Sequence, residues 1–227
     1  MLSNVIRRSE VSNLVLVEGD RDKEFIETLT QHCKINNVIC NPFGGITKLS
    51  YELDDLKKKS IIQNQVKKIG IITDLDEDSK KDRLDSIINE AIQEVFGKEF
   101  VISQVNDWIT VPVDAEVSVE ISCYFMNVNG RGELETVLRA IKKKDSPRAD
   151  CLEQWRKCVG ETGMKLTDNE FDELWINTYE RFDCCTKKQR KDAKKNCSFK
   201  PSIKKGAYDF DSPVLQELKQ FLIALTS

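Results

Sequence analysis

Two apolar segments that run directly into acidic residues constrain the fold of this chain most. Residues 13–17 read NLVLV and continue as EGDRD, and residues 69–72 read IGII and continue as TDLDED. Short runs rich in Val and Ile that are bounded by Gly or Asp are typical of buried strands. The segments between them predict a helix at residues 22–33, a short strand at residues 37–40 and a helix at residues 47–59.

The alternation of strands and helices continues further along the chain. Residues 79–95 carry apolar side chains at helical spacing, and strand-like pieces follow at residues 100–105, 108–113 and 118–126. A Gly-rich turn then precedes a helix in NVNGRGELETVLRAIK, residues 127–142. This order predicts an α/β fold with a mostly parallel sheet flanked by helices. In such sheets ligands bind beyond the carboxyl ends of the strands, where both acidic segments fall.

The character of the chain changes near residue 145. The stretch KDSPRAD at residues 144–150 is irregular, and residues 148–160 and 167–182 read as helices. We therefore expect a first domain at residues 1–145 and a mostly helical C-terminal extension at residues 146–227. The aromatic side chains expected to anchor this extension to a core are Trp155, Phe171, Trp175, Tyr179 and Phe182.

Positive charge gathers in one segment of the chain. The formal net charge is −3, which points to no class of partner, but residues 186–205 hold nine Lys or Arg and one Asp, a local charge of +8. Such a segment can neutralise phosphates, and Phe199, Tyr208 and Phe210 are expected to stack on unpaired bases. A solvated charged segment is the alternative interpretation. The predicted nucleic-acid-binding residues are Arg131, Lys187, Lys188, Arg190, Lys191, Lys204 and Lys205.

The cysteine content gives little evidence for a metal centre. The chain has eight Cys without a CxxC pair, and its single His is His32. We interpret the cysteines as reduced thiols, mostly in the core, and a metal site at Cys184, Cys185 and Cys197 stays the alternative. The first residues lack the apolar core of a secretory signal, and no run reaches the ~18 apolar residues that span a bilayer. We expect a cytoplasmic protein without a membrane partner.

The second acidic segment points to a divalent cation. Asp74, Asp76 and Asp78 alternate along the chain, so in an extended conformation their side chains lie on one side. Three neighbouring carboxylates repel one another unless a cation compensates or their pKa values rise. Oxygen ligands without His or thiolate favour Mg²⁺ or Mn²⁺ over Zn²⁺.

Two further acidic groups complete the candidate site. Glu18 ends the first strand, and Asp22 lies four residues later in the first helical turn, while Glu133 and Glu135 follow the Gly-Arg-Gly turn. Gly19 leaves space for a substrate at the end of the strand. Acidic residues at strand ends and helix starts also serve as helix caps, which is the alternative role for each of these residues.

The spacing of these motifs resembles the Toprim domain. That family is marked by a Glu after its first strand, often within V-E-G-x-x-D, and by a D-x-D after a later strand. Here Glu18, Asp22, Asp74 and Asp76 stand at those positions. The GGITKL turn and the GRGELE segment are similar to a small stand-alone OLD-like Toprim family. The resemblance covers residues 12–142 and implies a Toprim-type sheet.

The resemblance also implies metal-dependent hydrolysis of phosphodiester bonds in DNA or RNA, with two Mg²⁺ or Mn²⁺ ions. Asp74 and Asp76 would hold one ion with Glu18, whose other expected role is that of a general acid or base. The implied ligands of the second ion are Asp22, Glu133 and Glu135. A basic residue is expected to stabilise the transition state, with Lys48 as first candidate and Arg131, Lys204 and Lys205 as alternatives.

The implied partners include a separate protein. OLD-like nucleases work beside ABC-type or AAA-type ATPases in phage defence or DNA repair, and this chain lacks a G-x-x-x-x-G-K-[ST] loop of its own. A homodimer is left open. Two other functions also stay open: a non-catalytic nucleic-acid-binding module on a Toprim scaffold, and another phosphoryl-transfer enzyme such as a small primase or a nucleotide phosphatase.

Overall fold

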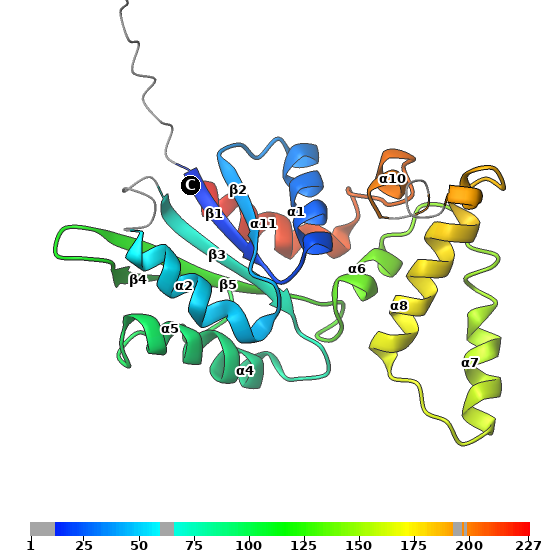
Figure 1. Cartoon of the computed structure of the whole chain (residues 1–227), viewed down its shortest axis with the longest axis horizontal. Helices are drawn as coiled ribbons and strands as arrows, with labels where there is room; N and C mark the ends of the chain where they lie inside the picture. The colour runs from blue at the N-terminus through cyan, green and yellow to red at the C-terminus, as the bar shows by residue number, and fades with distance from the viewer. Residues whose placement is uncertain (1–11, 60–65, 193–196, 198) are drawn as a thin grey trace, which may run out of the picture. The chain divides into compact units, whose positions relative to one another are not determined.

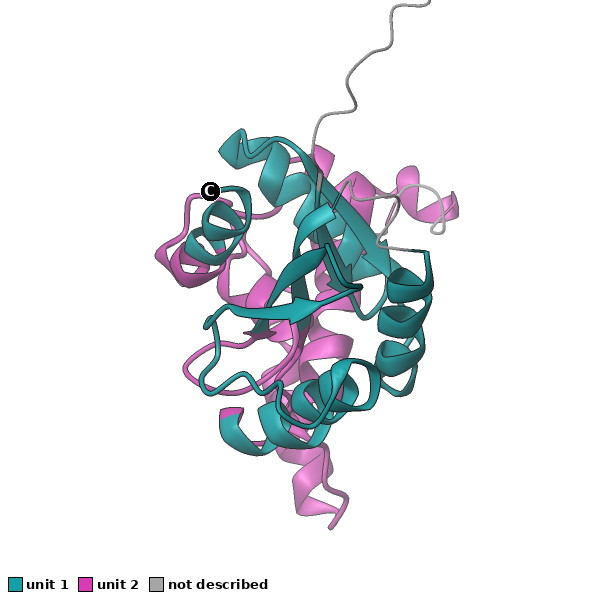
Figure 2. Cartoon of the chain, turned by 90° about the vertical axis from the view of Figure 1, so that its left-hand side faces the viewer, with its two compact units in different colours: residues 1–72, 81–124, 219–227 teal, residues 73–80, 125–218 magenta. Residues whose placement is uncertain are grey.

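The computed structural model describes residues 12–59, 66–192, 197 and 199–227. The chain forms two compact units. Unit 1 takes its described residues from 1–72, 81–124 and 219–227, and unit 2 is made of 73–80 and 125–218 (Figure 2). The expected domain boundary after residue 145 falls inside unit 2, and it stays a prediction because compact units of contacts need not coincide with domains.

A five-stranded sheet in the order β2-β1-β3-β5-β4 runs through the described residues (Figure 1). β1 pairs with β2 and β3 in parallel, and β4 pairs with β5 antiparallel. The fold is therefore α/β with a mostly parallel sheet, as predicted. The last residues of β3 and β5 belong to unit 2, and the rest of the sheet belongs to unit 1. The strands are β1 (Ser12–Val17), β2 (Val38–Pro42), β3 (Val66–Asp74), β4 (Ile109–Pro112) and β5 (Ser118–Met126).

Helices flank the sheet of unit 1. Lys57 in α2 donates its Nζ to the carbonyl oxygen of Val95 in α5 at 2.7 Å, so these two helices lie side by side (Figure 1). The ring of Phe221 in α11 lies against Gly70 at the centre of β3 and against Trp108 and Tyr124. The elements are α1 (Asp20–Cys33), η1 (Ile46–Lys48), α2 (Leu49–Lys58), α4 (Lys80–Arg83), η2 (Leu84–Asn89), α5 (Glu90–Phe96) and α11 (Gln216–Thr226). Lys80 and residues 216–218 of these helices belong to unit 2, as does η5 (Pro213–Leu215), which precedes α11.

One predicted strand is wrong. Residues 100–105 form a loop rather than a strand. The side chain of Asn89 accepts from the Ile102 amide at 2.8 Å and donates to the Ile102 carbonyl at 3.1 Å. Asn89 thus satisfies both backbone groups of Ile102, as a neighbouring strand would have done, and ties the loop to helix η2.

Unit 2 is mostly helical. Phe171, Trp175 and Tyr179 are fully buried, so the expectation that aromatic residues anchor this part of the chain is correct for them. It is wrong for Trp155 and Phe182, which are 44% and 39% exposed. The elements are α6 (Leu134–Ala140), α7 (Leu152–Glu161), α8 (Asp168–Thr178), η3 (Tyr179–Asp183), η4 (Gln189–Asp192) and α10 (Phe199–Lys204).

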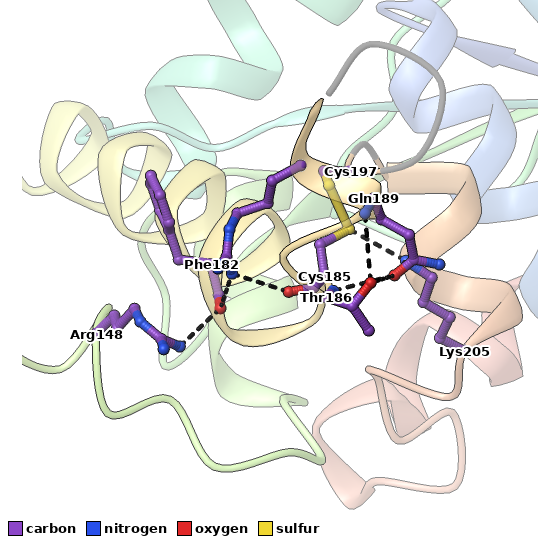
Figure 3. Close-up of a disulfide and its surroundings, with 8 residues drawn as sticks. Arg148, Phe182, Cys185, Thr186, Gln189, Cys197 and Lys205 are labelled. Carbon is purple, nitrogen blue, oxygen red and sulfur yellow. Dashed lines mark hydrogen bonds between the residues drawn. A yellow bond between two sulfur atoms is a disulfide. The ribbon is translucent and has the colours of Figure 1, made fainter. Parts of the chain in front are cut away.

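A disulfide joins Cys185 to Cys197 across a sequence separation of 12 residues (Figure 3). The prediction that the cysteines are reduced thiols is therefore wrong for this pair. Lys205 donates from its Nζ to Cys185 Sγ at 3.1 Å and to Gln189 Oε1 at 3.3 Å, beside the bridge. The sequence offered no CxxC spacing that would have indicated the bond.

Buried aromatic residues follow the basic segment. Phe199, Tyr208 and Phe210 are at most 8% exposed, which contradicts the expectation that they stack on nucleic-acid bases. The Tyr208 hydroxyl donates to Glu180 Oε1 at 2.7 Å, so this side chain is part of the core of unit 2. Within the part of the chain that the structure describes, we find no helix long and apolar enough to cross a membrane.

Candidate functional site

The first acidic segment lies in unit 1, at the point where β1 ends. The carbonyl oxygen of Glu18 accepts from the amides of Gly44 and Gly45 at 3.0 and 3.2 Å, which holds the GG loop against the end of the strand. Both glycines have positive φ, 78° and 108°, which favours Gly in this loop. The carboxylate of Asp22 accepts from the Gly19 amide at 3.0 Å. Asp22 therefore fills the capping role that the sequence left open beside metal binding.

The second acidic segment, residues 74–78, meets the segment that carries Glu133 and Glu135 in unit 2. Asp76 and Gly132 form a short antiparallel bridge, with N–H···O distances of 2.9 Å from Asp76 and 2.8 Å from Gly132. The Asp74 carboxylate accepts from the Leu134 amide at 3.0 Å, at the start of α6. The amide of Leu75 also donates to the Met126 carbonyl at 3.1 Å, which joins the ends of β3 and β5. These bonds bring the D-x-D segment to the start of α6.

The backbone is strained at Asp76 and Gly132, the two residues that form this bridge. Asp76 has φ of 57°, a left-handed conformation that non-Gly residues adopt uncommonly and that Asp tolerates better than most. Gly132 has φ of 99°, and a Cβ at this position would collide with the Thr136 side chain. Strained positions of this kind gather at functional sites.

The pKa of Glu133 is raised by its surroundings. Burial, and to a smaller extent the negative charges of Glu135, Asp76, Glu173 and Asp172, together raise its pKa to about 7. A carboxyl group with such a pKa has too little compensating positive charge around it. A cation bound among these acids would favour the charged form of Glu133.

The remaining predicted residues are more scattered. Asp78 and Lys48 are exposed, and Lys48 lies on η1 in unit 1. Arg131 is 69% exposed and donates to Asp168 at 2.6 Å. In the basic segment, Arg190 donates to the carbonyl oxygens of Phe182 and Cys185, at 3.2 and 3.0 Å, and so supports the turn at the disulfide. The exposed cations there are Lys187, Lys188, Lys191, Lys200 and Lys204, and Lys194 and Lys195 lie outside the described residues.

Sequence reasoning missed Asn169. Its Nδ2 donates to Asp76 Oδ1 at 3.1 Å from the first turn of α8, across 93 positions of sequence. This bond orients the carboxylate of the D-x-D segment. An Asn in a helical turn carries no acidic or basic signature, and no spacing rule joins it to a strand so far away in the chain.

The donor chemistry fits a hard divalent cation. Asp74, Asp76 and Glu133 offer carboxylate oxygens, the ligands that Mg²⁺ and Mn²⁺ prefer, and no thiol or imidazole takes part in this cluster. A carboxylate has about four lone-pair sites, so one hydrogen bond to each of these Asp side chains leaves capacity for a cation. Within the described ranges, no group of three or more acidic, His or Cys side chains is already arranged around one point as a metal site is.

A cavity of about 740 Å³ adjoins the cluster within unit 2. Asp76, Gly132 and Asn169 lie in its lining, together with side chains of α6, α7 and α8. Its size is within the range of about 300–1,000 Å³ that is usual for pockets that bind small molecules. The carboxylates of unit 2 therefore lie at the edge of a space that a ligand can enter.

A model of one protein family matches residues 12–227 of the chain. The chain belongs to the DUF3226 family. The description of DUF3226 reads "protein of unknown function", so membership assigns no activity. No curated protein and no solved structure matches the chain. The function of this DUF3226 chain therefore has to be argued from its own residues.

Proposed function

We propose that the chain is a nuclease that hydrolyses phosphodiester bonds of DNA or RNA with Mg²⁺ or Mn²⁺. The observation that carries this proposal is the backbone pairing of Asp76 with Gly132, which puts the D-x-D segment beside Glu133. Carboxylates from two separate segments then share one small region at the end of β3. The resemblance of the sequence to OLD-like Toprim nucleases supports the same reaction.

The residues of the chain would hold and orient the cation. Asp74 is fixed by the Leu134 amide and Asp76 by the Asn169 side chain, so both carboxylates have defined directions. Glu133 would become charged when the cation binds. Divalent cations, when bound, activate water and stabilise the leaving oxygen of a phosphodiester. Of the acids in unit 1, Glu18 stays a predicted ligand or general acid-base group, and Asp22 stays a predicted ligand of a second ion.

Three further expectations belong to the proposal. We propose a cytoplasmic location, a nucleic acid as the substrate and a separate ABC-type or AAA-type ATPase as a partner in phage defence or DNA repair. The exposed lysines at residues 187–204 are the proposed contacts to phosphates, and their contribution would fall with added salt. Lys48 stays the first candidate for a cation that stabilises the transition state, and the alternatives stay Arg131, Lys204 and Lys205.

The test compares the wild type with an Asp74→Asn/Asp76→Asn variant. Each protein is incubated with plasmid, single-stranded DNA and RNA in Mg²⁺, Mn²⁺ or EDTA. We expect Mn²⁺-dependent cleavage by the wild type and a loss of at least about 100-fold in the variant. Asp145→Asn, at an exposed acid of the same unit, is the matched control and should cleave normally.

A second readout does not depend on cleavage. Binding of Mn²⁺ measured by electron paramagnetic resonance should be tight in the wild type and in Asp145→Asn, and weak in the double variant. Undiminished cleavage by the double variant would refute the site. If the wild type binds nucleic acid but neither cleaves it nor binds Mn²⁺, the result would favour the non-catalytic module. Glu18→Gln, tested alongside, shows whether unit 1 supplies a required group.

A further inference from the structure

The cavity of unit 2 has walls of mixed charge. Arg131 and Arg156 both donate to Asp168, each at 2.6 Å, and these interactions, with the hydrogen bond from Arg156 first, lower the pKa of Asp168. Arg139 pairs with the nearly buried Asp172 at 2.6 Å and with Glu153. All of these residues line the cavity. Its polar surface therefore presents cations and carboxylates side by side.

This pairing argues against a simple anion site. A phosphate that entered the cavity would have to replace carboxylates at Arg131, Arg139 and Arg156, since each of these cations already has an acidic partner. A neutral group that both donates and accepts hydrogen bonds can use the arginines and the acids together. Nucleobase edges have this mixture of donors and acceptors.

Flat surfaces in the cavity favour the same ligand. The guanidinium of Arg139 lies 5.3 Å from the centre of the Trp175 ring, and the ammonium of Lys142 lies 5.0 Å from it. Guanidinium planes and aromatic rings are the surfaces on which proteins stack unpaired bases. Trp175 is 1% exposed and lies under these two cations, so the planar group open to a base is the guanidinium of Arg131, which lines the cavity and is 69% exposed.

An unsatisfied donor provides independent evidence for a ligand. Trp175 is 1% exposed and lines the cavity, and its Nε1 has no hydrogen-bond partner among the residues that the structure describes. A buried donor without an acceptor destabilises a protein, so native structures rarely keep one without a reason. A ligand with an acceptor atom beside Trp175 would accept the hydrogen bond that the indole N–H can donate.

We propose that the cavity binds one unpaired nucleobase of the nucleic-acid substrate. The identification of the ligand rests on the proposed nuclease function, because Asp76 and Asn169 belong to both the acidic cluster and the cavity lining. A base held there leaves its own backbone phosphate close to the carboxylates. A duplex must open one pair before its base can enter, so the substrate class is single-stranded or unpaired nucleic acid.

The experiment uses Trp175 as a reporter in the full chain. Trp108→Phe/Trp155→Phe leaves Trp175 as the single Trp of the sequence, and a thermal melt checks that this variant folds. Adenosine, cytidine, guanosine, uridine and inorganic phosphate are titrated separately in EDTA, with fluorescence as the readout. We expect saturable changes with at least one nucleoside, little dependence on salt, and no saturable change with phosphate.

A cavity-filling substitution locates the binding. Ala140 is exposed and lines the cavity, so Ala140→Phe should weaken nucleoside binding at least 10-fold without removing an ion pair. Ala115→Phe, at an exposed position in unit 1, is the matched control and should bind as the reporter does. If Ala140→Phe fails to fold, Ala140→Leu takes its place with a smaller expected loss.

The outcomes separate this inference from the nuclease proposal. Failure of every nucleoside to bind, binding of phosphate alone, or equal binding in Ala140→Phe would overturn the base site even if the wild type cleaves. Nucleoside binding that Ala140→Phe abolishes, in a protein that never cleaves, would support the base site and count against the nuclease. With an active enzyme, an unpaired oligonucleotide should compete at least 10-fold better than its duplex.

Discussion

The side chain of Asn169, in the first turn of α8, donates to the carboxylate of Asp76, with 3.1 Å between Nδ2 and Oδ1. Asp76 has a left-handed conformation and its backbone is paired with Gly132, so the backbone of this residue is held in place as well as its carboxylate. Mutation of residues that orient metal ligands typically lowers metal affinity or activity by about 10–100-fold. Helix α8 is thereby part of the candidate site and not an appendage to it.

Asn169→Ala should weaken Mn²⁺ binding about 10-fold, because the Asp76 carboxylate loses the bond that orients it. Electron paramagnetic resonance of free Mn²⁺ measures the affinity. Asn36→Ala, at an exposed asparagine in unit 1, should leave the affinity unchanged. An Asn169→Ala protein that binds Mn²⁺ as tightly as the wild type would show that this amide has no role in positioning.

Gly132→Ala should destabilise the protein and also impair the site. Its φ of 99° and the collision of a Cβ with Thr136 both oppose a side chain, and the expected loss in free energy of unfolding is about 2–3 kcal/mol. Gly130 has φ of 84° with open space around it, so Gly130→Ala bears the backbone cost alone, about 1 kcal/mol. Urea unfolding measures both values. A similar loss in the two variants would mean that the contact with Thr136 relaxes freely.

Gly70→Val should destabilise unit 1, because a Cβ added at Gly70 would lie 3.0 Å from the Phe221 ring. Overpacking of this kind costs about 1–3 kcal/mol. Lys67→Val, at an exposed position of the same strand, controls for the effect of Val on the strand itself and should be neutral. In a Gly70→Val/Phe221→Leu double variant, the smaller side chain should recover part of the lost stability. Urea unfolding of the wild type, the two single variants and the double variant gives the coupling free energy between residues 70 and 221.

Alkylation should divide the free thiols into two groups. Burial raises the pKa of Cys40 and of Cys123 to about 12, so both stay protonated and unreactive as the pH rises from 7 to 9. Cys151 and Cys158 are exposed and should react faster over the same interval, because the thiolate is the reactive form. Iodoacetamide labelling followed by peptide mass spectrometry measures each site. Rapid labelling of Cys123 in the folded protein would contradict its burial.

The same peptide map tests the disulfide. A peptide that links Cys185 to Cys197 is expected without reductant, and two further alkylated thiols are expected after reduction. Disulfides are uncommon in reducing compartments, so the state of this pair in protein taken directly from cells also bears on the expected cytoplasmic location. Quantitatively reduced thiols in such protein, with an intact fold, would mean that the bond is not needed there.

Most of the architecture could be predicted from local pattern. β1 and β3 carry continuous apolar runs whose ends are marked by Glu18 and Asp74, and such runs indicate buried parallel strands without knowledge of their neighbours. The loop at residues 100–105 was predicted wrongly because its apolar Val101 and Ile102 resemble a strand. Only the long-range bonds from Asn89 decide its conformation, and spacing along the chain does not reveal them.

The candidate site could be predicted only in part. The carboxylates could be predicted because they directly follow predicted strands. The pairing of Asp76 with Gly132 and the hydrogen bond from Asn169 could not, because they depend on how segments distant in sequence meet. The prediction that aromatic residues of the basic region stack on bases was wrong for a related reason. Tyr208 beside many cations suggests base stacking, whereas its hydroxyl is bonded to Glu180 in the core. Burial is a property of the folded chain, and composition alone does not determine it.

The route of the chain through its two units has a consequence for how the protein can be made. Unit 1 contains residues 219–227, which follow the whole of unit 2 in the sequence, and Phe221 from this stretch fills the space over Gly70. On the ribosome, the sheet cannot acquire this cover until every residue of unit 2 has already been synthesised. A gene fragment that stops before residue 219 would leave the apolar surface of β3 in water, and such a fragment should aggregate rather than fold.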